Sequence, residues 1–147
     1  MANLACEVVT PEKRIFSGGA SEVIVPSVDG SCGILPGHEM LACRMQNGVV
    51  VVYTDDSHSE KEEFATYMGF TEVSADRVLV LARKAIGVED IDLPTVKNEL
   101  SELKAKLEAM PVDALTKQQE RVEQIQRDSI ADEIEWRETL IEIAEGK

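Results

Sequence analysis

The chain of 147 residues is poor in aromatic side chains, in cysteines and in basic residues. Aromatic residues make up 4% of the sequence, so any core must be mostly aliphatic. The three cysteines form no C-x-x-C pair, which argues against a disulfide framework and against a zinc site. The net charge of −13 argues against nucleic acid or an anionic membrane surface as a ligand, because phosphate recognition needs a dense basic patch.

Long hydrophobic runs are also missing. The longest uninterrupted apolar run covers residues 49–53, far short of the roughly 20 residues that a membrane-spanning helix needs. The first seven residues have neither a basic start nor a long apolar run, so we expect no signal peptide. The sequence therefore predicts a soluble protein, without direct membrane insertion, that would reach a membrane only through a partner.

The groups needed for catalysis or metal binding are sparse. The stretch GSCGILPGHEML at residues 30–41 places Cys32 six positions before His38, as a thiol hydrolase could use them. The neighbours of Cys32 are glycine and aliphatic residues, which would raise the pKa of a thiol and not lower it. The glycines match neither G-x-G-x-x-G nor a Walker loop, and the acidic turn at residues 55–59 is typical of a solvated turn. We expect no catalytic residue, no metal and no cofactor.

Up to about Ile86 the pattern is that of short strands. Runs rich in β-branched residues predict strands at residues 6–10, 21–25, 49–54, 63–67 and 78–83. Clusters of turn-forming residues lie at 17–19, 29–31, 46–48 and 55–59. Asn47-Gly48, before four valines, predicts a hairpin. Because no helical pattern intervenes, we predict a compact β-sandwich or barrel.

After Gly87 the period becomes helical. Apolar residues at steps of 4, 3, 4 and 3 predict one helix, with its apolar seam at Val96, Leu100, Leu103, Leu107 and Met110. Asp92 is a plausible N-cap before Pro94, and Pro111 ends the helix because proline lacks the donor. A second helix is predicted from about residue 113 to 145. The short break predicts an antiparallel two-helix hairpin.

The second helix carries more apolar surface than the first helix can cover. One face has Leu115, Val122, Ile125, Trp136, Leu140 and Ile143, and the distal half adds Ile130, Ile134 and Ile141 on another face. The predicted helices are roughly 25 Å and 50 Å long. We therefore expect the sandwich, a second copy or a different protein to cover the distal half. The alternative is an ordinary long helix that is frayed at its end.

The stretch at residues 30–41 resembles the G-E-x-G-I-L-P-G-H-A-P-L segment of the epsilon subunit of F-type ATP synthases. The segments VVTPEKRIFSG at 8–18, SEVIVP at 21–26 and YMGFTEV at 67–73 are similar to strands of that family. VLVLARKAI at 78–86 and EDID at 89–92 resemble the end of its sandwich and the start of its helical hairpin. The resemblance covers residues 4–95 in motif and the remainder in architecture.

The resemblance implies an all-β sandwich domain at residues 1–87 that binds the gamma subunit and the ring of c subunits. It implies a regulatory helical hairpin at residues 88–147, which folds against the sandwich or extends toward the alpha and beta subunits and inhibits ATP hydrolysis. The chain would be a non-catalytic rotor subunit of the central stalk that couples proton translocation to ATP synthesis. It would be cytoplasmic and peripheral on the inner face of the plasma membrane, through the complex. The rival hypothesis is a free-standing β-sandwich adaptor that homodimerises through its hairpin.

The resemblance also selects candidate partner-binding residues, in the ring-facing loop and in the last helix. These are Asp29, Gly30, Ser31, Gly33, Pro36, Gly37, His38 and Met40, with Ile130, Ile134, Trp136, Leu140, Ile141 and Ile143. On this reading the glycines allow a tight loop to approach neighbouring subunits. Ser31 stands where the family has an acidic residue, and Glu39-Met40 stand where it has Ala-Pro.

Two further departures concern regulation. Ile91 and Asp92 match the start of the family's ATP-binding motif I-D-x-x-R-A, but Thr95 and Val96 stand where arginine and alanine would be. Losing the arginine removes the natural phosphate partner, so we treat the motif as degenerate. The last helix is strongly acidic, whereas the family's inhibitory helix uses basic residues against acidic segments of the beta subunit. Like charges oppose that docking, so a structural role is expected to dominate over inhibition.

Overall fold

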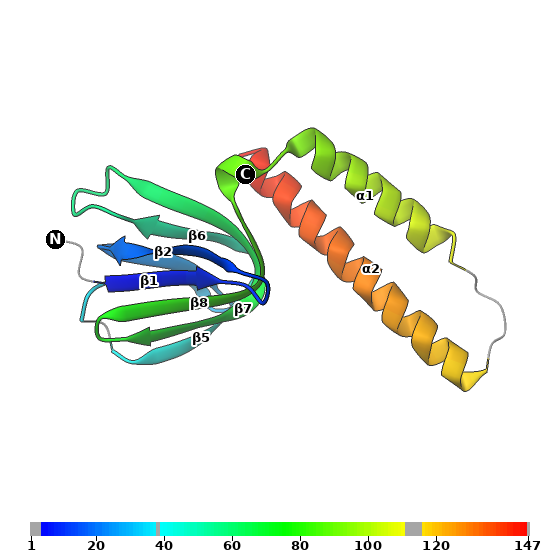
Figure 1. Ribbon diagram of the computed structural model, residues 1–147, viewed down its shortest axis with the longest axis horizontal. Coiled ribbons are helices and arrows are strands. Elements are labelled where there is room, and N and C mark those ends of the chain that lie inside the picture. Colours follow the sequence, from blue (N-terminus) through cyan, green and yellow to red (C-terminus); the bar gives the residue numbers. More distant parts are fainter. Residues whose placement is uncertain (1–3, 38, 111–115, 147) are drawn as a thin grey trace. The chain divides into compact units, whose positions relative to one another are not determined.

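The computed structural model describes residues 4–37, 39–110 and 116–146. The chain divides into two compact units, residues 1–90 and residues 91–147. Within the described residues, the first unit contains eight strands and a short 3₁₀ helix, and the second contains two α-helices (Figure 1). The predicted all-β sandwich followed by an antiparallel two-helix hairpin is confirmed.

The strands follow one another closely along the chain. They are β1 (Leu4–Val9), β2 (Arg14–Ala20), β3 (Glu22–Ser27), β4 (Gly30–Ile34), β5 (Leu41–Met45), β6 (Gly48–Tyr53), β7 (Lys61–Ser74) and β8 (Arg77–Gly87), with the 3₁₀ helix η1 at Val88–Asp90. Their order in the sheet is β2-β1-β8-β7-β5-β3-β4, and β6 pairs with β3 and β7. The β1–β8 pair is parallel, and the other pairs are antiparallel.

The long strand β7 organises the sandwich. Its first half pairs with β6 and its second half with β5, so β5 and β6 lie end to end along one side of it. Met68 and Gly69, at the junction, have positive φ values of 48° and 132°. Before the junction a residue with an even number, Phe64, faces the core, and after it a residue with an odd number, Val73, does so. Such a bend lets one strand serve two layers of a sandwich.

The core is aliphatic, as the scarcity of aromatic residues predicts. Its fully buried members are mostly valines from several strands, including Val8, Val23, Val25, Val50, Val52, Val78 and Val80. Because β-branched side chains pack well on a pleated surface, the same residues favour strands and fill the core. Each such valine contributes about 1.5–3 kcal/mol relative to an exposed side chain.

Some strand predictions were wrong. The glycines at 17–19 lie inside β2 and not in a turn, since Gly18 and Gly19 pair with Cys6 and Ala5 of β1. Strands β2, β4 and β5 carry too few β-branched residues for the pattern to detect. The hairpin predicted at Asn47-Gly48 is also wrong, because β5 and β6 pair with β7 in succession instead of with each other.

The helical unit consists of α1 (Leu93–Glu108) and α2 (Lys117–Ala144), which run antiparallel (Figure 1). Asp92 is the N-cap of α1, as predicted, and its carboxylate accepts a hydrogen bond from the Thr95 amide at 3.4 Å. Thr116 begins α2 with a capping box completed by Gln119, a signal that our reading of the pattern missed. The predicted helix break at Pro111 and the apolar position Leu115 lie outside the described residues.

Gly69 provides a stability test of the bend. A Cβ atom there would lie 1.9 Å from the carbonyl oxygen of Leu81, whereas a Cβ at Gly30, which also has a positive φ, would meet nothing within 4 Å. We predict that Gly69→Ala lowers the free energy of unfolding by about 3 kcal/mol or more, and Gly30→Ala by about 1–2 kcal/mol. Urea unfolding of the two full-length variants measures the difference. Equal losses would contradict a steric role for Leu81.

Candidate interaction surface

The segment predicted to face a partner is largely exposed in its described residues. Its first part is strand β4, which pairs only with β3 among the described residues, and a turn at Val28 and Asp29 precedes it. All seven described candidates in this segment are exposed, and His38 lies outside the described residues. The amide of Gly37 donates a hydrogen bond to the carbonyl oxygen of Ala75 at 2.8 Å, which ties the segment to the β7–β8 turn.

The segment is more apolar than its glycines suggested. Met40 is 83% exposed, and Leu35 and Val28 are 53% and 51% exposed. Val28 stands before the five-residue strand β4 and Leu35 follows it, so these exposed apolar side chains are spread along the segment, where each can contact another protein.

A second surface lies on the outer face of strands β5, β7 and β8. Phe70, 57% exposed, pairs in register with Leu81 of β8 on one side and with Arg44 of β5 on the other. Near them, the Nη1 atom of Arg83 lies 3.7 Å from the Sδ atom of Met68. We call Arg44, Met68, Phe70, Leu81 and Arg83 the outer patch. Alternation along residues 70–74 was visible in the sequence, but nothing in it marked this face as a contact surface.

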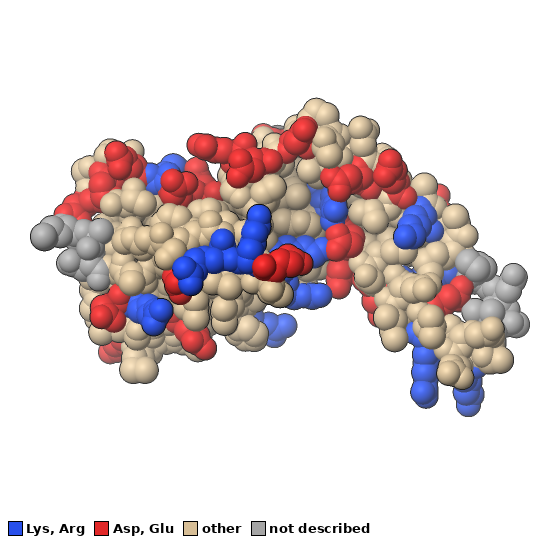
Figure 2. Space-filling model, viewed as in Figure 1, with Lys and Arg blue, Asp and Glu red and all other residues tan. Residues whose placement is uncertain are grey.

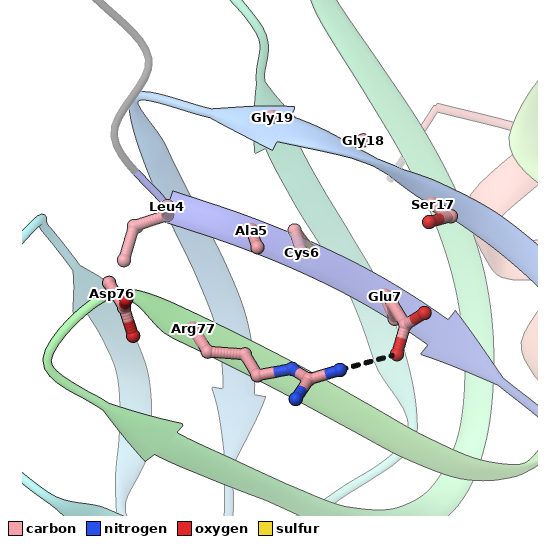
Figure 3. Close-up of a pocket in the computed structure, with 9 residues that line it drawn as sticks. All are labelled: Leu4, Ala5, Cys6, Glu7, Ser17, Gly18, Gly19, Asp76 and Arg77. Carbon is pink, nitrogen blue, oxygen red and sulfur yellow. Dashed lines mark ion pairs between the residues drawn. The ribbon is translucent and has the colours of Figure 1, made fainter.

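The same outer face continues to a groove over β1 (Figure 3). The groove has a volume of about 620 Å³. Ala5 and the two glycines Gly18 and Gly19 leave it hollow, because they carry little or no side chain. Glu7 lies on one side, 3.6 Å from the guanidinium of Arg77 and 3.4 Å from that of Arg14.

The outer face carries several arginines although the chain is strongly acidic. Arg14, Arg44, Arg77 and Arg83 are exposed, and they are four of the seven basic residues among the first 87. Figure 2 shows basic side chains across the face formed by β1 and β8. Arginine and exposed aromatic residues together are typical of the centre of protein–protein interfaces.

The last helix differs from what its pattern led us to expect. Ile130, Trp136 and Leu140 are buried within the chain, and Ile134, Ile141 and Ile143 are partly buried. The most exposed apolar side chains lie in the first half of α2, where Val122 and Ile125 are 53% and 69% exposed. A partner would therefore meet the predicted docking residues only after α2 is released.

The residues that the resemblance linked to nucleotide binding have a structural role. The Asp92 carboxylate caps α1, Ile91 is partly buried, and Thr95 occupies the position of the family's arginine. Of the residues that the structure describes, no three histidine, cysteine or acidic side chains gather as a metal-ligand set. Among the described helices, none has the length and apolarity needed to cross a membrane.

The thiols lie in surroundings that disfavour the reactive thiolate. Burial, assisted by the charge of Glu7, raises the pKa of Cys6 to about 12. Burial also raises the pKa of Cys43, with a smaller contribution from the nearby Cys32. Cys32 is partly buried against the core. A thiol–imidazole pair with His38 is not described by the structure.

The Asp55 turn, in contrast, is an ordered polar loop. The Asp55 carboxylate accepts hydrogen bonds from the Ser57 and Ser59 hydroxyls and from the amides of Ser59 and Glu60. The bond from Ser57 is the largest cause that holds the pKa of Asp55 well below its usual range. The carboxylate therefore serves to order the β6–β7 loop.

These features define a β-sandwich interaction module with an appended helical hairpin. Residues 3–88 match the model of the ATP synthase delta/epsilon chain β-sandwich domain. The ATP synthase epsilon chain of Prochlorococcus marinus (strain MIT 9303) is 40% identical over 108 residues, which cover 74% of this chain and 79% of that one. The epsilon chain of Myxococcus xanthus (strain DK1622) is 37% identical over 110 residues, covering 75% and 79% of the two chains. The chain therefore belongs to the ATP synthase delta/epsilon chain family, and the resemblance predicted from the sequence is confirmed.

A solved structure shares the fold. In the mitochondrial ATP synthase of Euglena gracilis, comprising OSCP, F1 and c-ring, one chain superposes with a TM-score of 0.66 at 19% identity. The match covers 95% of this chain and 80% of the Euglena chain. At that identity the likeness concerns the fold.

The burial of Cys6 makes a direct prediction. With a pKa of about 12, Cys6 carries on the order of 10³-fold less thiolate at pH 8 than an ordinary thiol. In a Cys32→Ser/Cys43→Ser chain we expect no reaction with a chromogenic disulfide reagent in the folded state and one thiol after unfolding in urea. Rapid reaction of the folded chain would contradict the burial of Cys6.

Proposed function

We propose that the chain is a non-catalytic rotor subunit in the central stalk of a proton-translocating ATP synthase. The observation that carries the proposal is the family match over residues 3–88, together with the epsilon chain relatives that match about three quarters of the chain. The sandwich would join the gamma subunit to the ring of c subunits, so that torque passes between proton flow and ATP synthesis. The subunit would lie on the cytoplasmic side, at the inner face of the plasma membrane, through the complex.

We assign the two partners to different surfaces of the sandwich. The outer patch would bind the gamma subunit, because Phe70 offers an aromatic anchor between Leu81 and Arg44. The segment from Val28 to Met40 would contact the c-ring, because its described residues include exposed apolar side chains and the Gly37 amide ties it to the β7–β8 turn. A surface that transmits torque must be stiff, and pairing within a continuous sheet provides this stiffness.

The hairpin would be a regulatory element with differential contacts in two states. Its six predicted docking residues would meet the alpha and beta subunits only in an extended state, since three of them are buried here. The acidic character of α2 disfavours binding to acidic segments, so inhibition of hydrolysis would be the weaker role.

The assignment of the gamma subunit can be tested by substitution. We predict that Phe70→Ser weakens binding of the full chain to an isolated gamma–c assembly by about tenfold or more, because the interface loses its aromatic anchor. Ile125→Ser is the matched control, since Ile125 is 69% exposed and lies in the other unit. Affinity equal to wild type for Phe70→Ser would contradict the assignment.

Truncation tests whether the sandwich alone provides assembly and coupling while the hairpin affects only hydrolysis. Deleting residues 112–147 is expected to leave the sandwich folded and ATP synthesis coupled, with a change in hydrolysis rate at most. Membrane vesicles that contain the reassembled complex allow both rates to be measured. Loss of assembly on truncation would contradict the proposal. A full-length chain that is a dimer and becomes a monomer on truncation would favour the free-standing adaptor, because that adaptor dimerises through its hairpin.

A further inference from the structure

One ion-pair cluster joins the two helices of the hairpin. The Nη2 atom of Arg137 on α2 lies 2.9 Å from the Oε2 atom of Glu99 on α1. Its Nη1 atom donates to Glu133, one turn earlier on α2. The Arg137 side chain is only 20% exposed, and the side chains of Glu99 and Glu133 are 42% and 34% exposed. One guanidinium thus binds two carboxylates from two helices at a partly buried position.

No other basic residue on this part of α2 could take over the ion pairs of Arg137. Between Asp128 and Ala144 the helix carries six acidic residues, and Arg137 is its only basic residue. The last turn of α2 contains no basic side chain that could favour the negative end of the helix dipole. Without Arg137, the carboxylates of Glu99 and Glu133 would be left close together without the cation that both contact, and would repel each other. The loss would therefore exceed that of an ordinary surface pair.

The apolar part of the hairpin is small. In α1 only Val96 is buried, and its seam residues Leu100, Leu103 and Leu107 are partly exposed. In α2 the buried residues are Ile130, Trp136 and Leu140, so Arg137 follows directly on a buried tryptophan. Because α1 buries so few side chains, its packing against α2 depends strongly on the ion pair between Arg137 and Glu99.

We propose that Arg137 is an electrostatic latch that holds α2 against α1 through Glu99, and that its removal shifts the hairpin toward an open state with Trp136 exposed. The latch is inferred from the contacts between the two helices. Its role in regulation rests on the proposed function of the hairpin as a two-state element. Any partner that offers carboxylates to Arg137, or a cationic group to Glu99 and Glu133, would compete with the closed state.

Trp136 reports the state of the hairpin, because it is the only tryptophan of the chain and is 7% exposed. In the full-length chain, Arg137→Met keeps a long apolar stem and removes the charge. We expect the equilibrium constant for opening to rise by about tenfold, seen as increased quenching of tryptophan fluorescence by acrylamide. Arg121→Met removes the same charge elsewhere on α2 and is the matched control, expected to behave as wild type. Far-ultraviolet circular dichroism verifies that both variants keep their helices.

A double-mutant cycle separates a latch from a general effect of charge. Glu99→Gln removes the α1 carboxylate and is expected to increase quenching, because Arg137 loses its partner on the other helix. In the Arg137→Met background the same change should add little or should reduce quenching, since the repulsion with Glu133 disappears. Unchanged quenching in Arg137→Met, or fully additive effects of the two substitutions, would overturn the proposal.

The experiment is independent of the proposed function. It uses the isolated chain without any ATP synthase subunit, so a failure to bind gamma–c assemblies leaves the latch standing. Conversely, quenching equal to wild type in Arg137→Met would contradict the latch proposal and would not affect the proposed rotor function.

Discussion

The sandwich depends on the close approach of β7 to β8 at Gly69, where the carbonyl of Leu81 leaves no room for a side chain. At this row the strand bends and its core-facing positions change parity, so that Phe64 and Val73 both contribute to one core. The neighbouring strands follow the change, since Val50 of β6 and Met45 of β5 both pack inward. One continuous strand can therefore belong to two layers, and a core made mostly of valine suffices because both layers share it.

The same bend determines which side chains reach solvent. Immediately beyond it, Phe70 and Leu81 face outward as a register pair, and Met68 and Arg83 lie beside them. A strand with regular alternation through residue 69 would turn Phe70 inward and expose Thr71 instead. The exposure of this patch is thus a consequence of how the core is closed. The helical unit is held differently, because its contact combines few buried apolar residues with an arginine shared between Glu99 and Glu133.

The sequence predicted the two-unit architecture well, because the change of period near Gly87 is a strong signal. Asp92 with Pro94 specified the start of α1 correctly, since capping and proline act locally. The pattern failed where structure is set by distant partners. Gly18 and Gly19 are strand residues because they pair with Cys6 and Ala5 of β1. Asn47-Gly48 connects β5 and β6, which both pair with β7 and not with each other. For the candidate site, the segment at 29–37 and 39–40 was selected through its motif and is exposed. The outer patch was not identified from the sequence. Exposure of Phe70 depends on the switch of core-facing positions at Met68 and Gly69, which no local pattern reveals.

The central claim is that the sandwich, and not the hairpin, attaches this chain to its complex. Amide hydrogen exchange of the full chain, free and bound to a gamma–c assembly, tests it most directly. The account predicts slower exchange on binding in the segment that follows Val28 and in β7 and β8 on both sides of Phe70 and Leu81, with little change in α2. Slower exchange confined to the helical unit would contradict it.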